Sequence, residues 1–445
     1  MAINVGLLGL GTVGGGTAAI LLDPQGRHPL LRDLQLRWVG VRDLNKPRRV
    51  NLPAEIITTD LMAIVNSPEV DIVVEVIGGI EPARSLILQA IAQGKHIVTA
   101  NKALISRHGD EIYTAANHAG VYVMLEAAVA GGIPIIQTLK QTLGVNQVHS
   151  VTGIINGTTN YILTRMQQEG ADFDEVLAAA QQLGYAEADP TADVDGLDAA
   201  DKISILASLA FGGRIKLEEV HCEGIRQISR VDIAYARELG FVIKLLAIAS
   251  RASQSRLSVR VHPTLVPHEH PLASINGVIN AVMVVGEPLG QVIFEGPGAG
   301  SGATASSVVA DILNVAAVLK TKAAWGHGAA IPQGESRLSL LHPLLSCSHQ
   351  DYCPISPITE LYTRFYVRFI TDDRPGVIGK LGTIFGEHQV SIESIVQKDT
   401  DDETAEIVVV THEVLEGNFR QAIAELRQLT VVQNIPTMLR VLEHE

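Results

Sequence analysis

The sequence Gly9-Leu10-Gly11-Thr12-Val13-Gly14 decides the fold of the N-terminal part of the chain. It stands between an apolar stretch at 3–8, which predicts a β-strand, and a run of small apolar residues, which predicts a helix. In such a unit Gly9 permits the tight turn, Gly11 lets the backbone approach a pyrophosphate, and Gly14 lets helix and strand pack closely. The phosphates would bind the free N–H groups of the helix N-terminus. A glycine-rich turn without a ligand is the alternative, but the flanking strand and helix favour a dinucleotide site.

Further strands are predicted at the apolar stretches 34–41, 71–77, 96–100 and 121–125, and a helix at 81–92 separates two of them. Apolar strands that alternate with helices indicate a parallel sheet buried on both faces. Ligands bind open sheets of this kind at the carboxyl ends of the strands. Residues at those ends are therefore candidates for contacts to a cofactor and a substrate.

The end of the second strand bears on the choice of cofactor. An NAD enzyme usually has an acid there, which binds the ribose 2′-hydroxyl. Arg42 occupies this place, Asp43 follows it, and Lys46, Arg48 and Arg49 come after them. A cation suits a 2′-phosphate, so the pattern favours NADP, while Asp43 leaves the use of NAD open. The alternative is a solvated basic loop.

Two further polar positions follow strands. Lys102 comes just after the strand at 96–100 and is placed to reach a nicotinamide or a substrate, although a surface lysine in a loop would look the same. The segment 126–134 is small and apolar with one acid, Glu126. Its backbone carbonyls could ligate a hard monovalent cation beside Glu126. A tight crossover between domains is the alternative.

An acid-rich stretch at 184–202 runs directly into an apolar helix predicted at 203–210. Asp198 and Lys202 are four residues apart, so they share one face of a helix. An exposed ion pair of this kind contributes only about 0.3–0.5 kcal/mol. The alternative is a site in which carboxylates hold an ammonium group and the lysine moves a proton. The remaining aspartates of the stretch have no assigned role: Asp189, Asp193, Asp195 and Asp201.

The rest of the chain predicts a second, open sheet and a separate tail. The strands predicted for this sheet are 242–249, 257–262, 278–285 and 289–294, and a further strand is predicted at 145–155. A second glycine-rich loop, 296–304, precedes a helix at 306–319 and either closes over the cofactor or is a flexible turn. The segment 322–357 has no clear period and is interpreted as a linker. The tail from 365 onward follows a βαββαβ order, which is typical of a regulatory module or a dimerisation domain.

Composition excludes several classes of function. The formal net charge is −14 and no basic block occurs, which argues against nucleic acid or an anionic membrane as partner. The three cysteines lack metal-ligand spacing, which favours a reducing compartment over a disulfide framework or zinc site. No apolar run reaches the ~20 residues that span a bilayer, and the first strand begins at Ile3, which leaves no room for a targeting peptide. The sequence therefore predicts a cytoplasmic protein.

In their joint order, these motifs resemble those of the homoserine dehydrogenases, and the match covers essentially the whole chain. The tail is similar to an ACT domain through Asp373-Arg374-Pro375-Gly376 and its βαββαβ pattern. The matching segments upstream are Gly9–Gly14, 99–104, 156–161, 184–190 with Asp198 and Lys202, and 296–300.

The resemblance implies an NAD(P)-dependent interconversion of L-homoserine and L-aspartate 4-semialdehyde in threonine, methionine and isoleucine biosynthesis. It implies that Glu187 and Asp198 bind the substrate, that Lys202 is the acid and base, and that Lys102 lies between substrate and cofactor. The implied cofactor contacts are Gly9, Gly11, Thr12, Val13, Gly14, Arg42, Lys102 and Gly302. The implied sodium site is formed by Glu126, Val129, Gly131 and Ile133. The ACT-like tail implies feedback control by an amino acid such as threonine, and the family implies a homodimer or homotetramer.

We therefore expect an α/β protein with three domains. Residues 1–130 form a Rossmann-type NAD(P)-binding domain completed by 303–321, and residues 131–302 form an α+β catalytic and dimerisation domain with an open sheet. A linker at 322–361 leads to an ACT-like regulatory domain at 362–445.

Two other functions compete with this interpretation. A phosphorylating semialdehyde dehydrogenase needs a thiolate nucleophile, and none of Cys222, Cys347 and Cys353 sits at a strand end beside a histidine. A catalytically inactive amino-acid sensor would keep the nucleotide fold and the tail. The intact set of Glu187, Asp198 and Lys202 speaks against the sensor.

Overall fold

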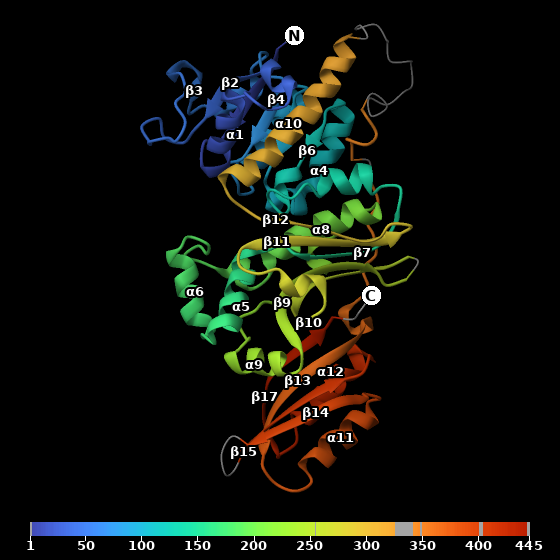
Figure 1. The fold of residues 1–445 in the computed structure, drawn as a ribbon. Helices are drawn as coiled ribbons and strands as arrows, with labels where there is room; N and C mark the ends of the chain where they lie inside the picture. The colour runs from blue at the N-terminus through green and yellow to red at the C-terminus, as the bar shows by residue number, and fades with distance from the viewer. Residues whose placement is uncertain (1, 254, 325–340, 348, 400–403, 443–445) are drawn as a thin grey trace. The chain divides into compact units, whose positions relative to one another are not determined.

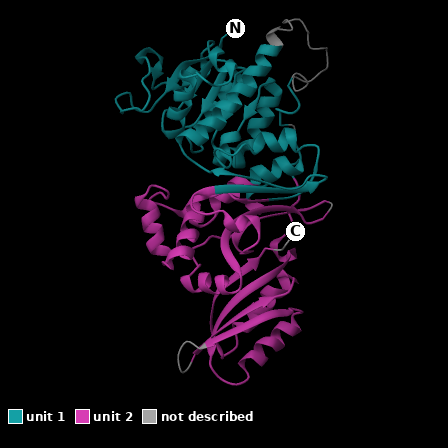
Figure 2. Ribbon diagram, viewed as in Figure 1, with its two compact units in different colours: residues 1–151, 204–217, 280–352 teal, residues 152–203, 218–279, 353–445 magenta. Residues whose placement is uncertain are grey.

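The computed structural model describes residues 2–253, 255–324, 341–347, 349–399 and 404–442. Its chain divides into two units, each built from several segments of the sequence (Figure 2). Unit 1 consists of residues 1–151, 204–217 and 280–352, and unit 2 of residues 152–203, 218–279 and 353–445. The two are described in turn.

Unit 1 is built on a six-stranded parallel sheet in the order β3-β2-β1-β4-β5-β6 (Figure 1). Strands β4 and β5 are wholly buried, and all of β1 except Asn4 is buried, as their apolar sequences predict. This is the expected Rossmann-type sheet. The strands are β1 (Ile3–Leu8), β2 (Leu34–Gly40), β3 (Ile57–Thr58), β4 (Ile72–Glu75), β5 (His96–Thr99) and β6 (Val123–Met124).

Helices of unit 1 are α1 (Thr12–Leu22), α2 (Leu61–Asn66), α3 (Ala83–Ala92), α4 (Lys102–Ala119) and α10 (Ser301–Ala324). Helix α10 lies along α1 (Figure 1), and their approach is so close that a Cβ on Gly16 would come within 2.4 Å of the Ser301 carbonyl oxygen. The Ser301 hydroxyl donates to the carbonyl of Thr12 at 2.8 Å. The start of α10 is thereby fixed beside the glycine-rich turn.

Helix α10 is also the one described helix long and apolar enough to cross a membrane, over residues 301–321. Core helices of soluble proteins pass the same test, and half of its most apolar window is buried. Val308, Ile312 and Val315 are inaccessible to solvent and belong to the core that covers the parallel sheet. We therefore interpret α10 as a core helix.

Unit 1 also holds three strands in the order β12-β11-β7, which are β7 (Gln147–Ile154, whose last residues enter unit 2), β11 (Ile279–Glu287, whose first residue belongs to unit 2) and β12 (Gly290–Pro297). Short 3-10 segments lie at Pro29–Asp33, Ala54–Ile56 and Glu126–Ala128, and a π-helical turn at Thr138–Thr142. Helices α2 and α4 were not predicted from the sequence. Much of the predicted linker, 325–340, lies outside the described residues.

Unit 2 has a sheet in which β17 of the tail lies next to β10, in the order β9-β10-β17-β13-β15-β14. Strand β17 pairs in parallel with β10 and antiparallel with β13. The strands are β8 (His221–Cys222), β9 (Phe241–Arg251), β10 (Leu257–Pro267), β13 (Tyr362–Asp372), β14 (Ile392–Asp399), β15 (Thr404–Thr411), β16 (Val414–Leu415) and β17 (Val432–Val441). The short strand β8 pairs in parallel with β10.

Helices of unit 2 are α5 (Gly157–Glu169), α6 (Phe173–Gln182), α7 (Thr191–Val194), the start of α8 (Leu197–Phe211), α9 (Arg230–Glu238), α11 (Val377–Glu387) and α12 (Glu416–Leu426). Short 3-10 segments lie at Pro271–Ser274 and Ile358–Glu360, and another, Leu217–Glu219, joins the two units along the chain. Helices α11 and α12 contact each other and share one apolar core with the tail strands, which confirms the predicted βαββαβ order.

An ion-paired cluster anchors the tail to the catalytic part of unit 2. The carboxylate of Asp232, on α9, is fully buried and accepts hydrogen bonds from Arg368 Nε at 2.8 Å and from Thr437 Oγ1 at 2.8 Å. Removing one member of a buried pair is costly, because the other charge stays desolvated. The tail is therefore held by contacts that are expensive to break.

Candidate active site

The glycine-rich turn has the geometry that a pyrophosphate needs. Gly9 has φ +104°, which other residues rarely adopt, and its N–H donates to the carbonyl of Gly40. A Cβ on Gly14 would come within 2.0 Å of the Gly9 carbonyl oxygen, so only glycine fits there. A Cβ on Gly11 would meet no atom within 4 Å. The turn is therefore tightly packed around Gly14, while the space next to Gly11 is open, and a dinucleotide would lie in that space.

This contrast predicts opposite effects for two alanine substitutions. We expect Gly11→Ala to fold with the wild-type melting temperature and to raise the Kd for NADPH at least about tenfold, or ~1.4 kcal/mol, because the methyl group occupies open space meant for the ligand. Gly14→Ala is expected to destabilise the fold by about 1–3 kcal/mol, because the added atom overlaps the backbone. Thermal melting and fluorescence titration with NADPH measure both effects. A Gly11→Ala protein that binds NADPH normally would contradict the placement.

The basic loop after β2 is exposed at Arg42. The carboxylate of Asp43 accepts a hydrogen bond from the N–H of Asn45 at 2.8 Å, and Arg48 donates to the carbonyl of Leu44 at 2.8 Å. Asp43 therefore stabilises the turn, while the guanidinium of Arg42 is accessible to a ligand.

A network that the sequence did not reveal organises the ends of β4 and β5. The fully buried carboxylate of Glu75 accepts hydrogen bonds from the N–H groups of Ile77 and Gly78 and from Thr99 Oγ1, the last at 2.6 Å. Asn101 caps the N-terminus of α4 and donates to the carbonyl of Gly79. These bonds fix the first turn of α4, where Lys102 lies half-buried. The sequence hint of this network is Glu75, an acidic residue within the otherwise apolar stretch 71–77.

In unit 2 the Asp198–Lys202 pair is buried. Lys202 Nζ donates to Asp198 Oδ2 at 2.6 Å, and the side chains are only 12% and 8% exposed, respectively. Nζ also donates to the carbonyl of Ile155 at 2.7 Å. The interpretation as a solvated surface pair is therefore wrong. The ammonium group of Lys202, near the start of α8, is therefore held by the Asp198 carboxylate and the Ile155 carbonyl.

Asn156 connects this pair to a second acid. Its Nδ2 donates to Asp198 Oδ2 at 3.0 Å and to Asp193 Oδ1 at 2.7 Å, while its Oδ1 accepts from the N–H of Thr159 and caps α5. Burial raises the pKa of Asp193, and the neighbouring charge of Asp198 adds to this effect. Asn156 and Asp193 thus join the site, although no role was predicted for either residue.

The other acids of the stretch serve local structure or lie apart. Asp195 pairs with Arg226 at 2.5 Å, and Asp189 accepts from the N–H of Thr191 in a turn. Asp201 is buried on α8. The side chain of Glu187 is exposed on the loop after α6, and no hydrogen bond or ion pair links its carboxylate to another side chain in the described part of the chain. Of the acids in this stretch, Asp198 therefore pairs with Lys202 directly, and Asp193 joins the pair through Asn156.

The segment around Glu126 is rich in buried oxygen atoms. The carboxylate of Glu126 accepts from the N–H groups of Ile136 at 2.7 Å and Gln137 at 2.8 Å. Its own N–H donates to Asp311 Oδ2 at 2.7 Å, and among the described residues Asp311 Oδ1 is buried without a hydrogen-bond partner. The carbonyl of Gly131 accepts from the hydroxyl of Ser307. Two buried carboxyl groups thus face one small turn.

The three thiols are poor nucleophiles. Burial raises the pKa of Cys222 to about 11, and it also raises the pKa of Cys347 and of Cys353. Cys222 Sγ donates to the carbonyl of Asp195 at 3.3 Å. Since the thiolate is the reactive form, this argues against covalent thiol chemistry. The lysine–carboxylate pair is suited instead to proton transfer beside a bound polar substrate.

Family models match the three parts of the chain separately. The NAD-binding domain of homoserine dehydrogenase matches residues 9–126, the homoserine dehydrogenase domain matches residues 134–313, and the ACT domain matches residues 365–431.

Similar proteins cover the whole chain. A homoserine dehydrogenase of Synechocystis sp. is 62% identical over 99% of this chain and 100% of its own length. One from Bacillus subtilis is 42% identical over 99% of this chain and 98% of its own. The crystal structure of a homoserine dehydrogenase from Thiobacillus denitrificans superposes with a TM-score of 0.88 at 42% identity, over 100% of this chain and 99% of that one. The chain belongs to the homoserine dehydrogenase family.

Proposed function

We propose that the chain interconverts L-homoserine and L-aspartate 4-semialdehyde with a nicotinamide cofactor. The observation that carries this proposal is the buried Asp198–Lys202 pair, which is held by Asn156 and the carbonyl of Ile155. In the direction of oxidation, neutral Lys202 takes the hydroxyl proton of homoserine. In the direction of reduction, protonated Lys202 stabilises the developing alkoxide and gives it a proton.

A bound nicotinamide cofactor would supply the hydride chemistry, with the alcohol carbon as donor in oxidation and the aldehyde carbon as acceptor in reduction. The residues present fit it: the open face of Gly11 and the first turn of α1 would hold the pyrophosphate, with Thr12, Val13 and Gly302 beside it. Exposed Arg42 supports a preference for NADP, because a guanidinium pairs with a 2′-phosphate. A hyperthermophilic archaeal homoserine dehydrogenase, 28% identical over 72% of this chain, is described in complex with NADPH.

Substrate binding is assigned to Asp198 and Glu187, whose carboxylates would hold the ammonium and hydroxyl groups. Exposure leaves Glu187 accessible to a ligand. Lys102, at the start of α4, is proposed to lie between substrate and cofactor.

Glu126 and the carbonyls of Val129, Gly131 and Ile133 are proposed to hold a sodium ion. Hard cations prefer oxygen ligands, and Asp311 Oδ1, which is buried without a hydrogen-bond partner among the described residues, supports this proposal as one more oxygen beside the turn. The ion would compensate the carboxylates and stabilise the turn.

This sodium site predicts salt-specific stability. Replacing N-methylglucamine chloride by sodium chloride at equal ionic strength should raise the melting temperature of the wild type by about 2 °C or more, because the ion binds only the folded protein. Glu126→Gln should lose this shift, while Glu175→Gln, a control on the exposed face of α6, should keep it. Equal melting temperatures of the wild type in the two salts would contradict the site.

The ACT domain is proposed to give feedback control by an amino acid, for which threonine is the first candidate, in threonine, methionine and isoleucine biosynthesis. We further propose a cytoplasmic homodimer or homotetramer. The presence of an ACT domain at the C-terminus supports the regulatory part of this proposal.

The proposed activity is tested by nicotinamide absorbance with homoserine and NADP or NAD. We expect homoserine-dependent cofactor reduction that needs no phosphate, with a higher kcat/KM for NADP. Reduction of NADP by the semialdehyde only when phosphate is present would identify the thiolate enzyme. Amino-acid binding without any turnover would identify the inactive sensor.

A further inference from the structure

We propose that Glu75 is a positioning residue for hydride transfer, because its buried carboxylate holds the loop after β4 and the first turn of α4, which carries Lys102, in one fixed relation. This inference rests on the proposed function, in which the nicotinamide and Lys102 meet at the same edge of the parallel sheet. The residues that carry it all belong to unit 1.

Glu75 lies at the centre of the edge where ligands bind such sheets. It is the last residue of β4, and it pairs with Leu8, the residue before the glycine-rich turn, and with Thr99, the last residue of β5. Ligands bind at the carboxyl ends of the strands, where the strand order reverses, and here it reverses between β1 and β4. Glu75 therefore adjoins the strand ends from which a cofactor and a substrate would be held.

A closed ring of hydrogen bonds, here called the Glu75 ring, begins and ends at this carboxylate. Oε1 accepts from the backbone N–H groups of residues 77–78 at 2.9 and 3.0 Å, and Oε2 accepts from Thr99 Oγ1 at 2.6 Å. Thr99 Oγ1 in turn accepts from the N–H of Asn101 at 3.1 Å. Asn101 Nδ2 donates to the carbonyl of Gly79 at 2.6 Å, which closes the ring through the loop after β4.

On one side, the Glu75 ring borders the place proposed for the cofactor. A Cβ on Gly9 would come within 3.0 Å of the Val76 carbonyl oxygen, so the loop after β4 packs directly on the glycine-rich turn. A Cβ on Gly78 would meet no atom within 4 Å, as at Gly11. The two open glycines indicate that a dinucleotide bound next to Gly11 continues along this loop, with its nicotinamide end at the ring.

On the other side, the ring holds the first turn of α4. Asn101 Oδ1 accepts from the N–H of Leu104 at 3.2 Å and caps the helix, and Lys102 is the first helical residue. The backbone of Lys102 is thereby fixed relative to the loop after β4. Since a misplacement of about 1 Å can slow a reaction about 100-fold, opening the ring should slow hydride transfer without removing a group that contacts the substrate.

A carboxylate suits this ring for a chemical reason. It accepts all three hydrogen bonds and donates none, whereas an amide has one acceptor oxygen and two N–H groups. In Glu75→Gln, either the Thr99 hydroxyl or the N–H groups of the loop therefore lose their acceptor. An apolar residue would be less costly to bury than this fully buried acid, but it would hold neither strand end.

The experiment compares full-length wild type with Glu75→Gln and Thr99→Val. Protein loaded with NADPH is mixed rapidly with L-aspartate 4-semialdehyde, and nicotinamide absorbance gives the single-turnover rate constant of hydride transfer. We expect each variant to lower this rate constant by about 10- to 100-fold. The double variant should be within about twofold of the slower single variant, because either substitution opens the same ring. Thr99→Ser keeps the hydroxyl and should recover most of the lost rate.

A second readout needs no turnover. Fluorescence titration should show a Kd for NADPH raised at least about fivefold in Glu75→Gln and Thr99→Val, the effect of losing about one hydrogen bond. The Kd for 2′,5′-ADP, measured by calorimetry, should stay within about twofold of wild type. This ligand lacks the nicotinamide half of NADPH, and the ring is assigned to the nicotinamide end.

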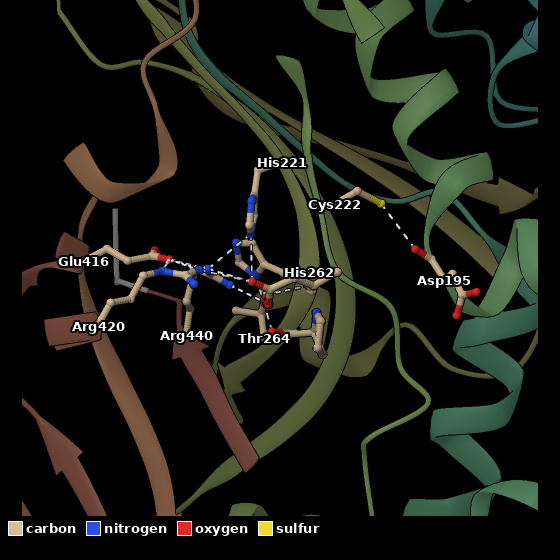
Figure 3. A network of polar contacts seen from close by, with 10 residues as sticks. Asp195, His221, Cys222, His262, Thr264, Glu416, Arg420 and Arg440 are labelled. Atoms are coloured by element: carbon tan, nitrogen blue, oxygen red, sulfur yellow. Dashed lines mark hydrogen bonds and ion pairs between the residues drawn. The ribbon is translucent and has the colours of Figure 1, made fainter. Parts of the chain in front are cut away.

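Two controls separate positioning from a loss of stability. Lys95→Met removes a buried hydrogen bond to the carbonyl of Val70, at 2.8 Å, just before the same two strands begin. Glu416→Gln makes the same substitution at another fully buried glutamate, in the network around Arg440 (Figure 3). Both controls should lower the melting temperature, while the rate constant and the Kd for NADPH stay within about twofold of wild type.

The outcomes separate this proposal from the proposed function. A normal rate constant with a reduced amplitude in Glu75→Gln and Thr99→Val, or equal slowing in Lys95→Met, would overturn the positioning role while the dehydrogenase activity stands. Equal weakening of NADPH and 2′,5′-ADP binding would also overturn it. Should Glu75→Gln not fold, the comparison of Thr99→Val with Thr99→Ser decides. If the wild type proved inactive with the semialdehyde, the proposed function would fail, and the two Kd values would still decide the place of the ring.

Discussion

The Lys202→Met variant is expected to lose about 100- to 10,000-fold in kcat, the range that general acid–base catalysis usually contributes. Methionine keeps most of the volume of the buried side chain, but it cannot take or give a proton. Asp198 keeps its hydrogen bond from Asn156, so the site should persist. The measurement is steady-state oxidation of homoserine, together with fluorescence titration of NADPH, whose Kd should not change.

A matched control separates this effect from the loss of any lysine. Lys398, on β14, is 47% exposed and pairs with Glu238 at the surface, where ion pairs contribute little. Lys398→Met should therefore keep normal activity. A Lys202→Met protein that binds NADPH and turns over at a near-normal kcat would remove the lysine from the mechanism.

The Asp198→Asn variant is expected to raise the KM for homoserine by about 10- to 100-fold, which corresponds to ~1.5–3 kcal/mol for a hydrogen bond to a charged group. The amide is the same size as the carboxylate but carries no charge to hold the substrate ammonium group. It also faces Lys202 and Asn156, which both donate to this position, so kcat should fall as well. Steady-state kinetics over a range of homoserine concentrations gives both values.

The control for this variant is Asp189→Asn. Asp189 belongs to the same acidic stretch, but it is exposed and only stabilises a turn. Its substitution should leave the KM unchanged. An unchanged KM in Asp198→Asn would instead remove Asp198 from substrate binding.

Features set by local spacing could be predicted from the sequence. The turn at Gly9–Gly14 lies between strand and helix as expected, because its glycines meet steric demands of neighbouring residues. The Asp198–Lys202 pair follows from a spacing of four residues on one helix. The strands of the parallel sheet could also be predicted, because a strand that is buried on both faces is a continuous run of apolar residues.

Contacts between distant parts of the sequence could not be predicted in this way. Asn156 joins Asp193 and Asp198 across 37 and 42 residues, and no local pattern encodes that approach. Lys202 is also held by the carbonyl of Ile155, which lies 47 residues earlier in the sequence. Helix α4 was missed because it carries many polar residues, and its first turn is fixed by Asn101 and Glu75 through tertiary hydrogen bonds.

The proposal that the chain interconverts L-homoserine and L-aspartate 4-semialdehyde is tested most directly by measuring both products of one reaction. The purified wild-type protein is mixed with L-aspartate 4-semialdehyde and NADPH in a buffer without phosphate, and oxidised cofactor and L-homoserine are quantified together. The account predicts one homoserine formed for each NADPH oxidised. Oxidation of NADPH without homoserine, or no oxidation by a folded protein that binds NADPH, would contradict it.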